Sequence, residues 1–245
     1  MKSRCWLVTA AVFVLAPAVS AAEGIEGKFT VAAQVGTQSE VSGNILQSAQ
    51  GTLFDKPVTI DSARYRDVYV PALVSRLQLL LGYGIGERSE IVARTTWYQA
   101  GYTGVEAGNL DGKALFAFFE PYDYEELGFE VGFRYYLASQ TRLKSYIAPV
   151  VGVRFLNEIL VSYSVQEAGS SIRFIPFSKK STVPVFGLDL GFTFDLGDRF
   201  FIGMDTGIRY QTAPGQFDYL LGLTEIDDSD GRWSAPVVAM LGVRF

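Results

Sequence analysis

The chain has 245 residues, of which 49% are hydrophobic and 14% aromatic, and its formal net charge is −5. This length is enough for one domain with a substantial core, and the acidic balance excludes the basic surface that nucleic-acid binding requires. The chain has no histidine, which excludes Ser-His and Asp-His catalysis and metal sites that depend on histidine. We therefore expect no enzyme activity, no cofactor and no metal.

Residues 1–22 have the pattern of a cleaved secretory signal peptide. Lys2 and Arg4 supply the positive start, residues 7–15 form a short apolar core, and small residues follow. A retained signal anchor is the alternative, but the short apolar core and the small residues favour cleavage. The only cysteine, Cys5, lies in the removed segment, so the exported chain is expected to have no disulfide.

Eight segments of the remaining chain, residues 23–245, alternate between apolar and polar side chains with the period of two that predicts β-strands. In residues 126–137 the odd-numbered positions are all apolar, and the even-numbered positions are mostly Gly, Glu and Arg. The eight predicted strands are residues 28–36, 77–86, 90–98, 126–137, 146–155, 186–196, 201–210 and 233–245. Pro149 lies inside one of them and should cost a ladder hydrogen bond or mark a bulge.

The connections between these strands alternate in length. Short turns are predicted near residues 86–89, 138–142 and 196–199, and long loops near residues 37–67, 101–123, 157–182 and 212–232. Because successive antiparallel strands reverse direction, every short turn lies at one end of the sheet and every long loop at the other.

The last strand carries apolar residues at every second position and ends on an aromatic residue, with Leu241, Val243 and Phe245 on one face. This resembles the C-terminal strand of bacterial outer-membrane β-barrels. Together with the signal peptide and the alternating connections, the whole chain resembles the small eight-stranded family that includes OmpA transmembrane domains, OmpX and OmpW. The resemblance implies an all-β, eight-stranded antiparallel up-and-down transmembrane barrel in the outer membrane of a diderm bacterium. It also implies insertion by the barrel-assembly machinery through the last strand.

Alternation alone does not say which face meets lipid, because a secreted lipocalin-like barrel would show the same period with its apolar face inward. The polar face is rich in glycine and carries Arg, Asp and Glu rather than Lys, which suits ion pairs in a narrow interior. Aromatic residues also gather near both strand ends, as in the girdles of membrane barrels. The predicted girdle residues are Trp97, Tyr98, Tyr102, Tyr124, Tyr210 and Trp233 at the loop end, and Tyr83, Tyr135, Phe200 and Phe245 at the turn end.

The polar face then places charged residues inside the barrel. The predicted network comprises Arg76, Arg94, Glu130, Arg134, Arg154, Asp189, Asp205, Arg209 and Arg244, with Glu90, Glu126 and Asp195 also facing inward. Eight strands enclose a space that side chains fill, so these charges should form salt-bridged networks. The network is either a structural plug or the gate of a polar pore, and we favour the plug.

Three of the predicted loops contain apolar aromatic clusters, which are candidate contacts for a ligand or a partner. The residues are Phe116, Phe118 and Phe119; Phe174 and Phe177; and Phe217 and Tyr219. They either belong to strands that continue above the membrane and pack on one another, capture a small hydrophobic solute as the OmpW resemblance implies, or bind a host or envelope protein as OmpX-like and Ail-like barrels suggest. We expect a structural or partner-binding, adhesin-like surface protein, with an OmpW-like channel for small hydrophobic solutes as the alternative.

Overall fold

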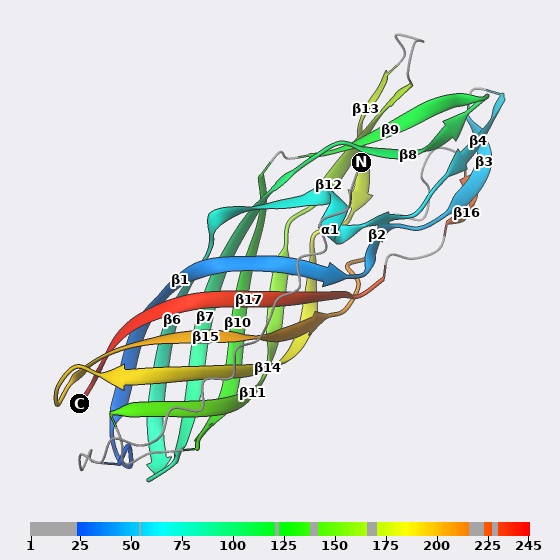
Figure 1. The fold of residues 1–245 in the computed structure, drawn as a ribbon. Helices are drawn as coiled ribbons and strands as arrows, with labels where there is room; N and C mark the ends of the chain where they lie inside the picture. The colour runs from blue at the N-terminus through cyan, green and yellow to red at the C-terminus, as the bar shows by residue number, and fades with distance from the viewer. Residues whose placement is uncertain are drawn as a thin grey trace.

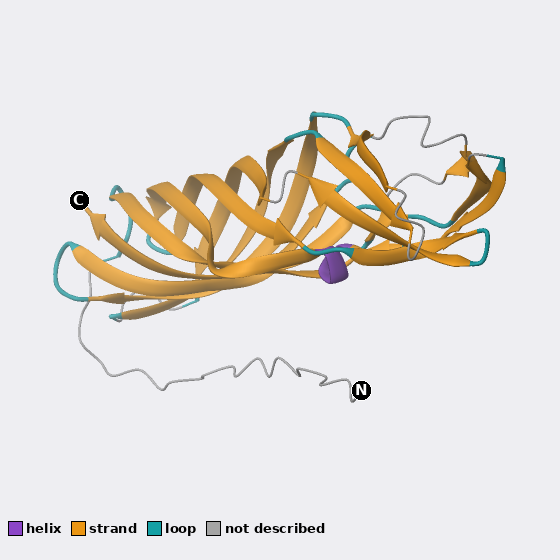
Figure 2. Cartoon of the chain, turned by 90° about the horizontal axis from the view of Figure 1, so that it is seen from above, coloured by secondary structure: helices purple, strands orange, loops and turns teal. Residues whose placement is uncertain are grey.

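The computed structural model describes residues 24–53, 55–120, 123–137, 142–165, 171–215, 223–226 and 230–245. The predicted signal peptide and most of the turn predicted near residues 138–142 lie outside this part of the chain. Within the described residues, no helix is long and apolar enough to cross a membrane. Two β-structures account for most of them, a closed barrel and a second sheet beyond one of its ends (Figures 1 and 2).

Eight antiparallel strands of the described chain close the barrel, in the order β1-β17-β15-β14-β11-β10-β7-β6. Their bounds are β1 (Phe29–Ser42), β6 (Tyr69–Gly86), β7 (Ser89–Tyr102), β10 (Asp123–Tyr136), β11 (Leu143–Leu156), β14 (Ser181–Asp195), β15 (Phe200–Gln211) and β17 (Arg232–Arg244). Each overlaps one of the eight predicted segments to within a residue at one end or contains it whole, so the predicted all-β, eight-stranded antiparallel barrel is confirmed. Several strands run further toward the loop end than predicted; β1 continues to Ser42 because Gln38 and Glu40 turn inward, where both are buried.

The first and last strands close the barrel by direct pairing. Thr30 lies opposite Arg244, and the backbones of Phe29 and Phe245 exchange two hydrogen bonds of 2.8 and 3.0 Å. The predicted turns at 86–89 and 196–199 are present as short connections between neighbouring strands. Pro149 faces outward, and the β10–β11 ladder lacks pairs beside it while keeping its register, so this proline costs ladder pairing without a bulge.

The described parts of the long connections are not irregular loops, because they contain strands that pair with one another. The described elements are β2 (Asn44–Leu46), β3 (Ala49–Leu53), β4 (Lys56–Ile60), β5 (Ala63–Arg64), α1 (Tyr65–Val68), β8 (Val105–Leu110), β9 (Lys113–Glu120), β12 (Ile159–Val165), β13 (Ser171–Ser178) and β16 (Leu223–Ile226). Among these, seven strands form one sheet in the order β13-β12-β9-β8-β4-β3-β16, which we call the outer sheet. Figure 1 shows it beyond the end of the barrel opposite the C-terminus.

The outer sheet has an apolar interior that continues into the mouth of the barrel. Leu115, Ala117 and Phe119 of β9 are buried, as are Val161 and Tyr163 of β12 beside them. They belong to one core that also includes Tyr98 and Tyr124 of the barrel strands. Apolar residues from different connections therefore form one common core. This core stabilises the strands in connections whose overall composition is polar.

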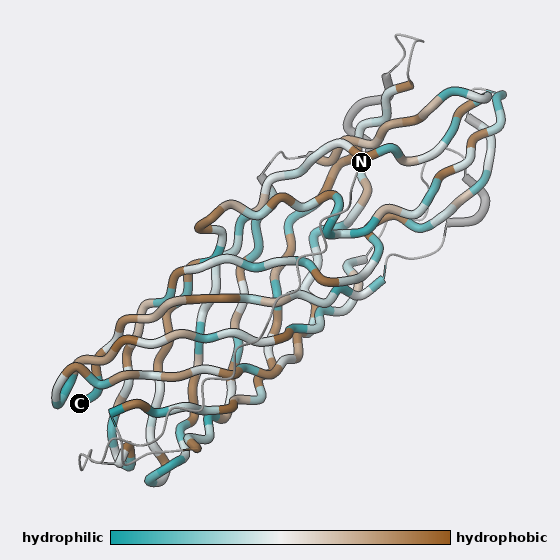
Figure 3. The backbone as a smooth tube through the Cα atoms, in the orientation of Figure 1, coloured by the Kyte–Doolittle hydropathy of each residue, from teal (hydrophilic) through white to brown (hydrophobic). Residues whose placement is uncertain are grey.

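The barrel buries the opposite kind of residue. Its outward side chains are mostly apolar, and Figure 3 shows hydrophobic segments in brown along the barrel strands. Val131 and Leu190, near the middle of their strands, are 54% and 52% exposed. Glu130 and Asp189, their neighbours in sequence, point inward and are buried. Apolar residues outside and charged residues inside are the arrangement of a barrel surrounded by lipid.

Candidate functional site in the barrel interior and mouth

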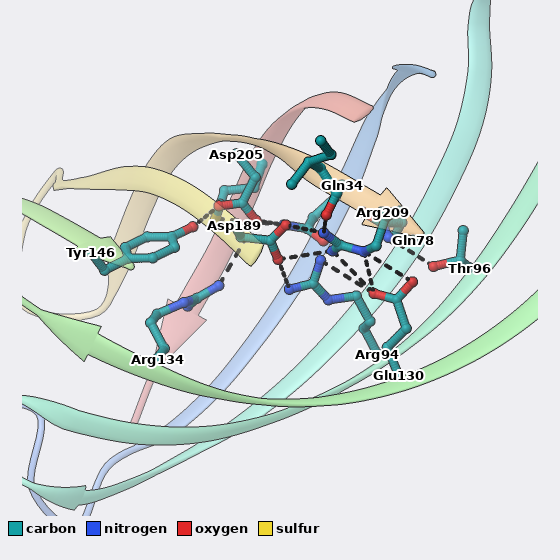
Figure 4. Close-up of polar contacts among 12 residues, drawn as sticks. Gln34, Gln78, Arg94, Thr96, Glu130, Arg134, Tyr146, Asp189, Asp205 and Arg209 are labelled. Atoms are coloured by element: carbon teal, nitrogen blue, oxygen red, sulfur yellow. Dashed lines mark hydrogen bonds and ion pairs between the residues drawn. The ribbon is translucent and has the colours of Figure 1, made fainter. Parts of the chain in front are cut away.

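The centre of the barrel holds a compact set of charges that we call the central group. It comprises Arg76, Arg94, Arg154, Arg209, Glu130 and Asp189 (Figure 4 labels four of them). The carboxylate of Glu130 pairs with all four guanidinium groups, at 3.2 Å from Arg209, 3.6 Å from Arg76 and 3.8 Å from Arg94, and it also accepts a hydrogen bond from Arg154. One carboxylate therefore ties together strands β6, β7, β11 and β15 from its place on β10.

Asp189 provides the second carboxylate of the central group, from β14. It accepts a hydrogen bond of 2.7 Å from Arg94 and two of 2.6 and 3.0 Å from Arg209. The paired contact with Arg209 is the bidentate geometry in which a guanidinium binds a carboxylate most strongly. With these contacts the central group joins six of the eight barrel strands across the interior.

Below the central group, toward the short-turn end, lies a lower group built on Glu90, Arg134 and Asp205. Arg134 donates to Glu90 at 3.0 Å and lies 4.0 Å from Asp205. The hydroxyl of Tyr136 donates to Glu90 at 2.8 Å, and that of Tyr146 donates to Asp205. These tyrosines fill the width of the barrel, since Arg134 stacks on the ring of Tyr146 with 4.1 Å between guanidinium carbon and ring centroid.

The short-turn end is closed by ion pairs and by the N-terminal segment. Arg244 donates to Asp195 at 2.6 Å, and Lys144 pairs with the same carboxylate. Ile25 enters the barrel from below and is 2% exposed, in an apolar cluster that includes Phe201 and Met240. The backbone of Ile25 lies against Gly84, where any side chain would collide with its carbonyl oxygen.

The opposite end is closed by a mouth group around Arg232, which the sequence reasoning did not identify. Arg232 pairs with Glu126, lies 3.8 Å from Glu40, and donates to Gln211 at 3.0 Å. Its guanidinium carbon also lies 5.4 Å from the ring centroid of Tyr69, within cation–π range.

Two further tyrosine rings lie around the guanidinium group of Arg232. The guanidinium carbon of Arg232 is 5.6 Å from the centroids of both Tyr65 and Tyr124. The cavity that these rings line with Leu156 and Ile159 has a volume of about 10 Å³, room for about one water molecule. Among the described residues around Arg232, side chains leave no larger space than this. The signal that could have identified Arg232 is its place two residues before Ser234, on the same inward face of the last strand, at the point where the loop prediction ended.

The structure places all nine residues of the predicted network inside the barrel and buries each of them. It divides them among three groups: Arg76, Arg94, Glu130, Arg154, Asp189 and Arg209 in the centre, Arg134 and Asp205 in the lower group, and Arg244 at the base. Glu90, Glu126 and Asp195 also take part in these contacts.

The predicted aromatic girdle is partly wrong at the loop end. Trp233 lies on the outer surface, but Tyr98 and Tyr124 are 0% and 2% exposed and turn into the mouth. They do so because their neighbours in the alternation, Trp97 and Glu125, take the outward positions. At the turn end, Tyr83 and Phe200 are exposed on the outer surface as predicted.

The predicted loop patches do not form one surface. Phe119 and Phe177 are buried and pack edge to face, with ring centroids 5.6 Å apart. Phe118 is 41% exposed on the other face of β9, and Phe116, on the same face, is half-buried. The side chain of Phe174, and the residues Phe217 and Tyr219, lie outside the part of the chain that is described.

The pairing of β6 with β7 is irregular near the mouth, where the register between the two strands shifts and β6 forms a bulge that we call the corner of β6. From Pro71 to Arg76, β6 advances five residues while its partner β7 advances two, from Ala100 to Tyr98. The extra residues include Leu73, which is 90% exposed. The ladder between β1 and β6 ends at the pair Gly36–Arg76.

Side chains close the seam between β1 and β6 above that point. The hydroxyl of Thr37 lies 3.2 Å from the hydroxyl of Ser75 and donates to the carbonyl of Ala72 at 3.2 Å. The backbone N–H of Gln38 donates to Ser75 at 3.4 Å. Three hydrogen bonds that involve hydroxyl groups thus replace the backbone ladder.

These observations define the class of protein. A closed eight-stranded antiparallel barrel with an apolar exterior and a paired, charged interior is the architecture of a small transmembrane β-barrel, and it agrees with the predicted location in the outer membrane. Among the described residues, no group of three or more Cys, Asp and Glu side chains is arranged to hold a metal ion.

No protein-family model and no curated protein sequence matches the chain. Among solved structures, OprG of Pseudomonas aeruginosa is 15% identical with a TM-score of 0.45, over 91% of this chain and 98% of that one. Ail of Yersinia pestis is 12% identical with a TM-score of 0.38, over 90% and 99%. The N-terminal β-barrel domain of P. aeruginosa OprF is 10% identical with a TM-score of 0.39, over 90% and 98%. These TM-scores are low, so the architecture rests on the strand pairing of this chain itself.

Proposed function

We propose that the barrel is a closed anchor in the outer membrane and that its outer sheet presents a contact surface to a host or envelope protein. The observation that carries the proposal is the filled interior, in which charged groups pair at the mouth, centre and base. An interior of this kind supports a structural role for the network rather than that of a pore. The proposal assigns no catalytic step, since no histidine is present to activate a nucleophile.

The outer sheet supports the second half of the proposal because it has a core of its own. A surface held by buried residues such as Leu115 and Val161 keeps its shape without a partner, which lowers the entropic cost of binding. Phe118 offers an exposed aromatic side chain on the outward face, of the type enriched where proteins bind each other.

A photo-crosslinking amino acid at position 118 tests the contact surface on bacteria that display the chain. The expected result is a protein adduct from position 118 and none from position 119, where the side chain is buried on the opposite face of the same strand. Deletion of β8 and β9 should remove both the adduct and adhesion of the bacteria to epithelial cells. Adhesion that survives the deletion unchanged would show that the outer sheet is not the contact surface.

A channel for small hydrophobic solutes is the second candidate, and the corner of β6 is the observation that favours it. A seam closed only by hydroxyl contacts is a place where the wall could part and let a solute pass into lipid. The exported chain is predicted to have no cysteine, so Thr37→Cys combined with Ser75→Cys gives a crosslink specific to this seam. If oxidation abolishes solute uptake and reduction restores it, the result would support the channel. If uptake is the same with and without the crosslink, solutes do not pass through this seam.

We also propose that Leu241, Val243 and Phe245 act as the signal for the barrel-assembly machinery. Leu241 and Phe245 are 60% and 64% exposed on the lipid-facing side of β17, and Phe245 stacks on Phe29 with ring centroids 6.2 Å apart. Phe245→Ala should slow assembly of the barrel in cells more than Phe200→Ala, which removes an exposed ring at the same end. Equal assembly of the two variants would contradict a signalling role.

A further inference from the structure

Apolar side chains form a buried cluster inside the barrel, beside the ion pairs of the lower group. Seven of the eight barrel strands contribute to this apolar cluster, which includes the rings of Tyr136 and Tyr146 that contact the lower group. Its other strand residues are Ala32, Leu80, Val92, Ala148, Phe201 and Met240. Because apolar constrictions exclude water, the cluster shields the lower group from the short-turn end, which faces the periplasm in outer-membrane barrels.

The remaining member of the apolar cluster, Ile25, does not belong to a barrel strand. It lies in residues 24–28, just before β1, which we call the strap. The backbone N–H of Lys28 donates to the carbonyl of Ile25 at 3.1 Å, and Gly27 between them has a φ of +73°. This is a tight turn whose third residue needs the left-handed conformation that glycine adopts without strain. The turn directs the side chain of Ile25 into the cluster, where it is 2% exposed.

The strap is held to the barrel wall at Gly84 of β6. The N–H of Gly27 donates to the carbonyl of Gly84 at 2.8 Å, and the N–H of Gly84 donates to the carbonyl of Lys28 at 2.9 Å. The carbonyl oxygen of Ile25 occupies the place where a Cβ atom at position 84 would stand, so the strap fits there only against glycine.

The position of the strap in the chain makes it separable from the barrel. It follows the predicted signal peptide, so cleavage at residue 22 would leave it joined to the rest of the protein only through β1. Segments at chain ends that few contacts hold open at a lower free energy than the ladders of a closed sheet.

We propose that the strap is a detachable seal, which leaves the base of the barrel while the eight strands stay folded and thereby lets periplasmic water reach the apolar cluster. In the closed state Ile25 completes the cluster, and in the open state the cluster lacks the one member that no barrel strand supplies. The ion pairs of Asp195 with Arg244 and Lys144 join barrel strands and remain in both states. The strap acts independently of the contact surface proposed for the outer sheet.

A cysteine in place of Ile25 reports whether the strap is closed. The exported chain is predicted to have no other cysteine, and the small apolar side chain of cysteine suits the cluster. In detergent micelles, which leave both ends of the barrel accessible, a small, charged thiol reagent should label Ile25→Cys slowly. It should label Glu87→Cys, at an exposed position of the neighbouring turn, quickly. Equal labelling rates at the two positions would overturn the proposal, because the strap would then seal nothing.

Two substitutions release the strap from opposite sides, and each has a glycine control. Gly84→Ala places a Cβ atom against the carbonyl of Ile25, and Gly27→Val places a β-branched residue at a φ of +73°. The controls are Gly86→Ala and Gly24→Val, since neither glycine has a positive φ and the added Cβ meets no atom closer than 3.6 Å. The reporter cysteine should react at least about tenfold faster in the release variants than in the controls.

All four variants should keep the electrophoretic shift between heated and unheated barrel. Loss of that shift in the release variants, while the controls keep it, would mean that the strap is part of the barrel wall and would overturn the proposal. Unchanged labelling of the reporter in both release variants would overturn it as well, because the strap would then not detach.

Val92→Cys tests the seal itself, since Val92 lies in the apolar cluster on β7 and is 1% exposed. In a chain with Ile25 intact, labelling of this cysteine should be faster with Gly27→Val than with Gly24→Val. If Val92→Cys stays unreactive although the reporter at position 25 is labelled quickly, the strap detaches without admitting water, and its role as a seal is excluded.

Discussion

The barrel and the outer sheet are built from the same kind of antiparallel strand, yet they bury opposite residues. Inside the barrel, Arg76 and Arg134 are fully buried, and the apolar side chains face outward. Inside the outer sheet, Leu115 and Val161 are fully buried, and polar residues such as Ser162 take the outward positions. The difference follows from the surroundings, since lipid solvates apolar side chains and water solvates polar ones.

This contrast means that the two regions have different sources of stability. The barrel interior depends on pairing every charge that it encloses, and loss of one partner leaves others unpaired. The outer sheet depends on apolar contact area, as a soluble domain does. Four substitutions compare the two regions, taken here from the largest expected effect to the smallest.

Glu130→Ala should have the largest effect, because it leaves four guanidinium groups with only Asp189 as a counter-charge. Breaking a buried ion pair costs about 3–5 kcal/mol, and here one carboxylate serves four pairs. The measurement is urea unfolding of the refolded barrel. Glu125→Ala, an exposed position on the same strand, is the control and should change stability by less than about 0.5 kcal/mol. Similar losses in both variants would contradict a structural role for the network.

Phe119→Ala should destabilise the outer sheet while the barrel stays folded. The cavity left by a buried phenylalanine costs about 3–5 kcal/mol. The ring contacts that are lost are with Phe177 of the outer sheet and Tyr102 at the loop end of β7, away from the central group. Limited proteolysis should cut β8, β9 and β12 faster, and the electrophoretic shift between heated and unheated barrel should persist. Phe118→Ala removes the same side chain from the opposite, exposed face and should leave proteolysis unchanged. Protection that is equal in both variants would mean that the packing of Phe119 does not hold the sheet.

Val131→Arg tests the lipid-facing side of the strand that carries Glu130. An arginine near the middle of the bilayer costs about 2–4 kcal/mol, so we expect a loss somewhat smaller than that of Glu130→Ala. Unfolding in lipid vesicles measures it. Thr59→Arg, at an exposed position on β4 of the outer sheet, is the matched change in water and should have little effect. An equally small loss for Val131→Arg would mean that this face does not meet lipid.

Asp111→Asn should have the smallest effect, because the carboxylate is exposed at the tip of the outer sheet. Asp111 accepts a hydrogen bond of 2.9 Å from Lys56, which lowers the pKa of the carboxyl group below its usual value. A lowered pKa in the folded state stabilises the chain above the unfolded pKa, and this contribution is lost as the pH falls through the folded one. Protease protection of the β8–β9 hairpin should therefore decrease slightly at acidic pH, and the Asn variant should lack that decrease.

The barrel could be predicted from the sequence because its alternation is strict. In β10, odd positions such as Phe129 face lipid and even positions such as Glu130 face inward. This alternation can be read directly from the order of residue types along the strand. The choice of the charged face as the inner one followed from its glycine content and from its Arg, Asp and Glu in place of Lys. The pairing of four arginines with one carboxylate could not be predicted, because it depends on the register between strands that are distant in sequence.

The strand pairing of the outer sheet could not be predicted from the sequence, because its strands are short and irregular. β3 and β4 carry Gln50, Thr52 and Thr59 between small apolar residues, a composition that also fits loops. These strands are stable because β4 pairs with β8, and β9 with β12, which are contacts between separate connections. Arg232 was missed for a related reason, since it belongs to the barrel interior but stands where the alternation begins.

Single-channel recording of the refolded chain in a planar bilayer tests most directly whether the interior is closed. Paired charges at the mouth, centre and base predict that the inserted barrel gives no discrete conductance steps, whereas a Glu130→Ala barrel that still inserts should begin to conduct or fluctuate. Steady, well-defined steps from the unaltered chain would contradict the closed interior and favour the channel.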